Sequence, residues 1–259
     1  MSKRILTYNG INLSTFNAHV SGEGAWVKPA PEFERISVPG RSGDVLLYNG
    51  RYSNVDITYR FGITNNFDTN YTNLIAALLG SPGYHKLVDS KHPGVYRMAA
   101  VDKVIDPVMS QQLSVGEFDV TFNCKPQIYL DSGEDPELMW SRSTDISSSI
   151  TNPTGFAAYP LIKITMQTYN PGSFTISFTG EIYYSIYFNE KLTTGTFSGV
   201  ITCDPENGDV YDGNGKSLNE YAEINKFSIP ANGIMGISLS SNAKAVVNKV
   251  EVIPRWWKL

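Results

Sequence analysis

Runs of alternating apolar and polar residues, separated by Asn-Gly pairs, are the feature that most restricts the fold of this chain. Val55, Ile57, Tyr59 and Phe61 alternate at period two a few residues after Asn49-Gly50. An Asn-Gly pair between two such runs indicates a β-hairpin, because both residues accept the positive φ values of its turn. The sequence predicts hairpins at Asn9-Gly10, Asn49-Gly50 and Asn207-Gly208, and a further turn at Asn214-Gly215.

The composition agrees with an all-β protein. Only 18% of the 259 residues are charged, whereas 41% are apolar, so the chain can form a packed core and is not a disordered segment. The 22 glycines and 14 prolines supply many turns, and 12% of the residues are aromatic, a class enriched in strands.

One segment, about residues 68–79, has the pattern of a helix. Asp68 is placed to cap its free amides, and Gly80 is placed to end it in the left-handed conformation. Its apolar stripe consists of Tyr71, Leu74, Ile75 and Leu78. We expect this helix to lie across an open face of a sheet.

The chain is expected to form two domains, residues 1–135 and residues 136–259. The first contains the helix and long strands over 94–101 and 117–124. The acidic, turn-rich stretch 131–137 marks the boundary between the two domains. Beyond it, short strands recur at a spacing of about ten residues with no helix, which predicts a β-sandwich. Expected strands include 182–188, 227–229 and 245–253.

Charge and hydropathy exclude several classes of partner. The net charge is −4, from 21 basic and 25 acidic residues, so the chain lacks the basic excess of a nucleic-acid-binding protein. No window approaches 18 apolar residues, so no transmembrane helix and no membrane partner are expected. Asn9-Gly10 follows Met1 too closely for the apolar core of a signal peptide, so secretion is not expected.

No catalytic or metal-binding pattern is found. His19, His85 and His92 lack the partners of a catalytic triad or a zinc site, and surface or turn positions account for them better. Cys124 and Cys203 are expected to be free thiols, with Cys124 on the apolar face of its strand. The acidic residues of 204–212 do not match an EF-hand and are interpreted as turn residues. We therefore predict no enzyme activity, no cofactor and no metal.

Two further segments need an explanation. Residues 38–44 resemble a glycine-rich anion loop but lack the Gly-Lys-Ser/Thr sequence and precede a strand, so a fixed turn is the better interpretation. Trp256 and Trp257 lie next to the end of the sequence, and we expect them to pack on a domain of the chain or, less favoured, on a partner.

The order and spacing of these segments resemble the distal tail protein of long-tailed bacteriophages that infect Gram-positive bacteria. The matching segments are Val38-Pro39-Gly40-Arg41-Ser42-Gly43-Asp44, Tyr84 to Asp89, His92 to Arg97, Phe122 to Gln127, Ile150 to Pro153, Ile201 to Gly208 and Pro254 to Trp257.

The resemblance implies an N-terminal ring-forming β domain, of β-sandwich or split-barrel type with one helix, and a C-terminal galectin-like β-sandwich. It also implies a structural virion protein at the phage tail tip, made in the cytoplasm of the host bacterium. Such a protein forms a homo-hexameric ring that joins the tail tube protein to the baseplate or tail-tip hub, lets DNA pass through its lumen, and in some cases contacts a receptor-binding protein. Residues 131–259 contain no histidine, so we do not expect galectin-type binding of β-galactosides.

Two turn-rich segments, residues 38–44 and 84–97, are the candidates for assembly contacts. Their sequences fix the turns more closely than a simple connection between strands requires. The candidate residues are Pro39, Gly40, Arg41, Asp44, His85, His92, Tyr96 and Arg97. The alternative function is a monomeric carbohydrate-binding adhesin, in which exposed aromatic residues such as Tyr183 and Tyr187 stack on sugars. A cell-wall glycosidase is a third and more distant possibility.

Overall fold

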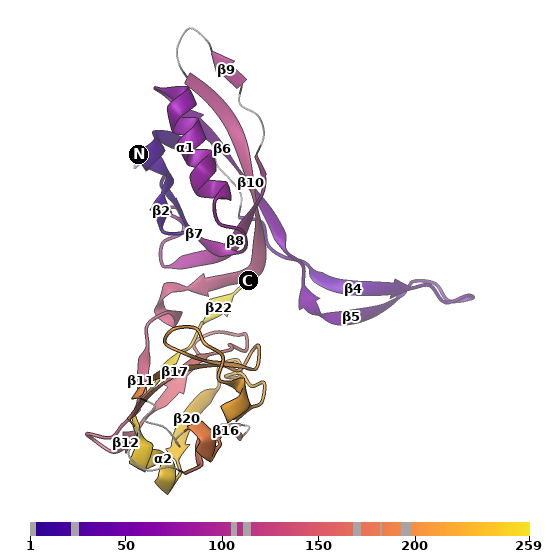
Figure 1. Ribbon diagram of the computed structural model, residues 1–259. Coiled ribbons are helices and arrows are strands. Elements are labelled where there is room, and N and C mark those ends of the chain that lie inside the picture. The colour runs from indigo at the N-terminus through magenta and orange to yellow at the C-terminus, as the bar shows by residue number, and fades with distance from the viewer. Residues whose placement is uncertain are drawn as a thin grey trace. The chain divides into compact units, whose positions relative to one another are not determined.

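The computed structural model describes residues 4–21, 26–104, 108–110, 115–167, 172–181, 183–192 and 198–259. The chain forms two compact units, which are residues 1–128 together with Leu259, and residues 129–258. Figure 1 shows the strands that dominate both. Each unit is described by itself.

The first unit is built on one curled sheet with the strand order β2-β1-β7-β8-β10-β6-β3. The pairs of consecutive strands in this path for which a register is defined are antiparallel. The strands of this part of the chain are Leu6–Tyr8 (β1), Ile11–Asn12 (β2), Ala18–Ser21 (β3), Pro31–Ile36 (β4), Val45–Tyr52 (β5), Val55–Ile63 (β6), His85–Asp89 (β7), Val95–Val104 (β8), Val108–Ser110 (β9) and Val115–Leu130 (β10).

The central pair of this sheet, β6 and β10, follows the predicted alternation. Tyr59 and Phe61 point inward and are buried, as are Phe122 and Cys124 on the facing strand. The predicted strands and the core position of Cys124 are thus confirmed. The outward residues pair across the strands, with Thr58 Oγ1 lying 2.8 Å from Thr121 Oγ1.

The predicted helix is present as α1 (Phe67–Leu79), and it packs on the inner face of the sheet. Tyr71 meets Phe118 of β10 edge to face, with ring centroids 5.0 Å apart. Phe67 also fits against this strand because residue 116 is glycine. A Cβ there would lie 2.5 Å from the Phe67 ring.

Both ends of α1 differ from the sequence prediction. The N-cap is Asn66, which adopts φ 42° and makes no side-chain cap bond, whereas Asp68 lies in the first turn. Gly80 ends the helix with φ −68°, in the right-handed region, and Gly83 takes the positive φ of 103° instead. The predicted left-handed stop at Gly80 is therefore wrong, because the reversal of the chain occurs three residues later.

The hairpin predicted at Asn9-Gly10 is confirmed by the pairing of β1 with β2. The one predicted at Asn49-Gly50 is wrong, because these residues lie inside β5, which pairs with the preceding strand β4. The register passes from Pro31 opposite Tyr52 to Phe33 opposite Tyr48, so β5 contains extra residues at this point. Gly50, at φ +73°, therefore forms a β-bulge and not a turn.

The second unit is a two-sheet β-sandwich, with the strand orders β12-β11-β21-β14-β17-β18 and β13-β20-β15-β16-β19. The inner faces of both sheets contribute to one buried apolar cluster. The strands of these sheets are Glu137–Ser141 (β11), Ile146–Ser147 (β12), Ser149–Thr151 (β13), Leu161–Gln167 (β14), Phe174–Thr179 (β15), Tyr184–Phe188 (β16), Ser198–Asp204 (β17), Asp209–Asp212 (β18), Ala222–Ile224 (β19), Ile234–Leu239 (β20) and Val247–Ile253 (β21). The last strand, Trp257–Lys258 (β22), pairs with β10.

The predicted turns of this unit are confirmed. Asn207-Gly208 joins β17 to β18, and Gly215 adopts φ +80° in the following turn. The expectation of a unit without a helix is wrong, because α2 (Ser241–Val246) replaces the start of the predicted strand 245–253. Ser240 caps α2 by accepting from Ala243 N at 3.2 Å. Six residues are too few to give a helical period in the sequence.

Two other expected strands have a different outcome. Residues 227–229 form only an isolated bridge between Ala158 and Ile229. Strand 182–188 is observed as β16 from Tyr184, and Ile182 lies outside the described residues. Short 3-10 helices occur at Leu13–Phe16 (η1), Asp131–Gly133 (η2), Glu190–Leu192 (η3) and Asn219–Tyr221 (η4).

The last tryptophans are part of the second unit. Trp256 is buried in its core, and its carbonyl accepts from Leu130 N at 2.9 Å. Trp257 stacks on Phe156, with centroids 4.5 Å apart, and its Nε1 donates to Ala157 O at 2.9 Å. The overall prediction of an all-β fold with little helix is confirmed.

Candidate assembly surface

The β4–β5 hairpin exposes large apolar side chains. Phe33 is paired with Tyr48, and their rings lie 5.5 Å apart by centroid. Leu46 and Leu47 are adjacent on β5, so they point to opposite faces of the ribbon. The exposed fractions are 44% for Phe33, 42% for Ile36, 38% for Val38, 56% for Leu46, 53% for Leu47 and 47% for Tyr48. Both faces of this hairpin are therefore apolar and open.

The hairpin forms a sheet of two strands only, and within the part of the chain that is described no third strand pairs with it. A lone two-stranded ribbon is marginally stable in water. Its free edges and clustered apolar side chains are features that soluble proteins normally cover. A surface of this kind is typical of a segment that becomes covered on assembly.

The loop between β4 and β5 contains the first group of predicted contact residues. Pro39, Gly40, Arg41 and Asp44 are all exposed there. Arg41 N donates to Val38 O at 3.1 Å, and Gly40 adopts φ +78°. The loop is thus a defined turn at the end of the apolar ribbon, where its side chains are accessible to another molecule.

The second group lies on or between β7 and β8 of the curled sheet. His85 contacts the ring of Tyr8 edge to face at 5.7 Å, and Tyr96 is 6% exposed beneath the Lys86 ammonium. His92 is half-buried in the connecting turn. Arg97 is fully buried, so its side chain cannot itself form a contact with a partner. The structure therefore places the two groups in different sheets.

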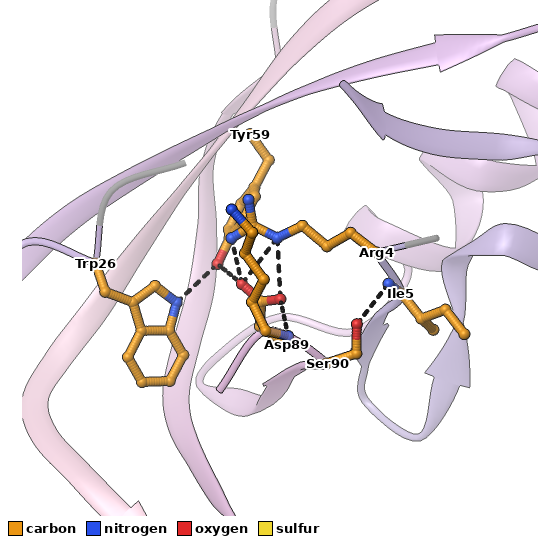
Figure 2. Close-up of polar contacts among 7 residues, drawn as sticks. Arg4, Ile5, Trp26, Tyr59, Asp89 and Ser90 are labelled. Atoms are coloured by element: carbon orange, nitrogen blue, oxygen red, sulfur yellow. Dashed lines mark hydrogen bonds and ion pairs between the residues drawn. The ribbon is translucent and has the colours of Figure 1, made fainter. Parts of the chain in front are cut away.

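The first unit contains a buried polar network that no sequence pattern predicts (Figure 2). Arg4 Nε donates to Asp89 Oδ1 at 3.0 Å, and Tyr59 Oη donates to Asp89 Oδ2 at 3.2 Å. Trp26 Nε1 in turn donates to Tyr59 Oη at 3.1 Å. The network joins the start of the chain, β6, the end of β7 and the segment before β4.

The ionisation of this network follows from its burial and charges. Burial alone would raise the pKa of Asp89. The hydrogen bonds that it accepts from Arg4 and Lys91 N, together with the positive charge of Arg4, have the larger effect, so the pKa is lowered. Burial and the Asp89 charge raise the pKa of Tyr59. The site therefore contains an ionised carboxylate with a protonated tyrosine.

The two thiols are buried and unpaired. Burial raises the pKa of Cys124 to about 12 and also raises that of Cys203, so neither is a reactive thiolate at neutral pH. Over the described ranges, no three histidine, cysteine, aspartate or glutamate side chains are grouped to hold a metal. In the same ranges, none of the helices has the length and apolar character needed to span a membrane.

Three solved structures resemble this chain over nearly its full length. The Dit protein (gp 19.1) of phage SPP1, described as a paradigm of the hub adsorption apparatus of phages that infect Gram-positive bacteria, aligns with 11% identity and a TM-score of 0.64, covering 100% of both chains. This chain has the Dit fold. The P2 baseplate in its activated conformation with Ca contains a chain with 10% identity and a TM-score of 0.57, over 97% of this chain and 98% of that one.

The third structure is the p2 baseplate in its activated conformation with Sr, with 10% identity and a TM-score of 0.54 over 96% of this chain and 97% of that one. No protein-family model matches the sequence, and no curated protein sequence matches it. The Dit fold is therefore evident in the three-dimensional structure at an identity too low for sequence matching.

The exposed hairpin was only partly predictable from the sequence. Leu46, Leu47 and Tyr48 are consecutive and break the period-two pattern of a strand with one wet face. That break is the one available signal that both faces of β5 are apolar. The network of Arg4, Tyr59 and Asp89 left no local signal, because its members are up to 85 residues apart.

Proposed function

We propose that this protein is a structural component of a phage tail tip, where it forms a homo-hexameric ring between the tail tube and the baseplate hub. The Dit fold, shared with hub and baseplate proteins over the whole chain, supports a place in such an assembly. The observation that carries the proposal is the β4–β5 hairpin, whose exposed apolar faces need a partner.

A second copy of the chain is the partner that fits the hairpin. In a closed ring each subunit has two different binding patches. The first patch of one subunit binds the second patch of its neighbour. The hairpin supplies one projecting patch of this kind, and covering Leu46, Leu47 and Tyr48 would remove large apolar area from water. The loop residues Pro39, Gly40, Arg41 and Asp44 would then lie against the same neighbour.

The ring would also contact tail proteins on its two faces and let DNA pass through its lumen. The tail tube protein, the hub protein and a receptor-binding protein are the proposed partners. A chain with net charge −4 has no excess of cations to bind phosphates, which suits a passage that must not retain DNA. This role needs no catalytic group and no cofactor.

The native mass of the purified protein tests the proposal. A hexamer of 28.6-kDa subunits has a mass of about 172 kDa. Light scattering should give this value, and negative-stain images of the same peak should show a ring with an open centre. A monomer at high concentration that stays monomeric with the tube or hub protein would contradict the proposal.

One observation favours the carbohydrate-binding adhesin as a second candidate. Tyr187 lies on β16 of the five-stranded sheet and is 37% exposed, and Tyr183, just before β16, is 66% exposed. Ser177 Oγ lies 2.6 Å from Tyr183 Oη. The outward residues of the neighbouring strands are mostly hydroxyl side chains: Ser149, Thr151, Thr175, Ser177, Thr179, Ser185 and Ser238. A glycan array with the parent and Tyr183→Ala protein distinguishes this function, because only an adhesin loses binding on substitution.

A further inference from the structure

The β4–β5 hairpin is attached to the curled sheet of its unit by two segments of chain. At one side β5 continues into β6 through Ser53 and Asn54. At the other side residues 26–30 lead into β4. Ser53 N donates to Ala30 O at 3.1 Å, so the two segments meet at the base of the ribbon. The direction of the hairpin depends on how firmly each of them is held.

The incoming segment is held through the indole of Trp26. Its Nε1 donates to Tyr59 Oη at 3.1 Å, and Tyr59 is fully buried in the sheet (Figure 2). The indole ring stacks on His92, with centroids 4.0 Å apart and planes at 23°. Trp26 is therefore held at two points: its Nε1 hydrogen-bonds to Tyr59 of β6, and its ring stacks on His92 in the turn between β7 and β8.

The next residue is held by Arg97. Its Nη2 donates to Val27 O at 3.0 Å, while Nη1 donates to Lys125 O at 3.2 Å and to Pro126 O at 3.3 Å. Its Cζ also lies 5.2 Å from the centroid of the Trp26 ring. Because a guanidinium has donors in a rigid planar fork, this one buried group ties the incoming segment to β10.

We propose that Trp26 and Arg97 are positioning residues that fix the direction of the β4–β5 hairpin and so present it ready for a neighbouring copy. The presence of that copy rests on the proposed function. A ribbon held at one point can pivot about that point, whereas a second attachment removes this freedom. The conformational entropy of the hairpin is then lost when the subunit folds. It is not lost again when the hairpin binds a neighbour, so it does not weaken association.

Pulsed EPR on the full chain tests the direction of the hairpin directly. One spin label is attached at Ser42→Cys in the hairpin loop and one at Glu117→Cys on β10. Both native cysteines are buried, so they should not take up label, and only the distance between the two introduced sites is measured. The labelled protein is diluted with unlabelled protein so that only distances within a subunit are measured. We expect a narrow distance distribution for the parent and a much broader one for Trp26→Ala.

Two further variants separate positioning from a general loss of stability. Trp26→Phe keeps an aromatic ring against His92 and should recover most of the narrow distribution. Tyr71→Ala removes a similar ring from α1, which does not carry the hairpin, and should leave the distribution narrow although it destabilises the unit. A narrow distribution for folded Trp26→Ala, or equal broadening for Tyr71→Ala, would overturn the proposal.

The same variants measured by light scattering test the link to assembly. We expect Trp26→Ala to need roughly tenfold more protein than the parent to reach the same ring fraction. Broadening of the EPR distance with unchanged ring formation would overturn the role of the anchor in assembly. If the parent itself is monomeric, the proposed function fails, whereas the EPR distances still decide whether Trp26 positions the hairpin.

Discussion

The hydroxyl of Tyr59 lies 3.2 Å from Oδ2 of Asp89, and both residues are completely buried. Arg4 supplies the counter-ion, with 6% of its side chain exposed. This contact connects β6 to the end of β7 and to the start of the described chain. Since Trp26 hydrogen-bonds to the same tyrosine hydroxyl, the carboxylate of Asp89 also supports the base of the hairpin.

Asp89→Asn should lower the free energy of unfolding by about 3 kcal/mol, because it leaves the poorly exposed Arg4 guanidinium without its counter-ion. Denaturant unfolding followed by circular dichroism measures this loss. Asp119→Asn is the matched control. It breaks an ion pair with Arg60, whose side chain is 60% exposed, and should give no resolvable change. Equal losses in the two variants would refute the special role of Asp89.

The contribution of Asp89 should depend on pH with a definite sign. Its pKa in the folded state is below the ordinary value of 3.8, so the unfolded chain binds the proton first as the pH falls. The difference in free energy of unfolding between the parent and Asp89→Asn therefore has its full value at neutral pH. It becomes smaller below about pH 4, where Asp89 is protonated in the unfolded chain. Urea unfolding of both proteins over a pH series checks this. A difference that grows on acidification would show that Asp89 is not stabilised as an ion.

Local patterns in the sequence determine the elements that were predicted well. The stripe from Tyr71 to Leu78 and the alternation from Val55 to Phe61 are each periodic, so their burial follows from sequence alone. Asn49-Gly50 predicts a turn but forms a β-bulge, because the same dipeptide suits both, and the choice depends on which strand pairs with β5. That partner precedes the pair in the sequence and is not the strand that follows it.

The sequence indicates two parts of the candidate surface, the loop and the apolar run Leu46-Leu47-Tyr48. Pro39 and Gly40 signal a fixed turn, and the structure places that turn at the end of an exposed ribbon. The burial of Arg97 could not be foreseen, because its acceptors are backbone carbonyls at residues 27, 125 and 126. Every residue type has a backbone carbonyl, so the residue types at these positions do not show that they accept hydrogen bonds from Arg97.

The two thiols give a simple check on the packing of both units. Because Cys124 and Cys203 are fully buried with raised pKa values, neither should react with a thiol reagent such as DTNB in the native protein. Both should react once the protein is unfolded in denaturant. Ser81→Cys, at an exposed position, is the positive control and should add one fast-reacting group. Rapid reaction of the native parent protein would mean that one of the cores is open.

Charge placed on the apolar ribbon should prevent assembly without unfolding the subunit. Leu47→Asp puts a carboxylate on a side chain that is 53% exposed, so the stability of the isolated subunit should change by no more than about 0.5 kcal/mol. Burying that carboxylate against a neighbour, however, carries a large desolvation cost. Light scattering should therefore show subunits in place of rings.

Leu79→Asp on α1 is the control for this substitution, because Leu79 is equally exposed, at 54%, but lies outside the hairpin. It should leave the rings intact, and Arg41→Ala in the hairpin loop should have an effect between those of the two aspartate variants. If Leu47→Asp forms rings as well as Leu79→Asp does, the hairpin is not covered by a neighbouring copy. Co-purification of the parent and Leu47→Asp proteins with the tube or hub protein would then test whether the hairpin binds another tail protein.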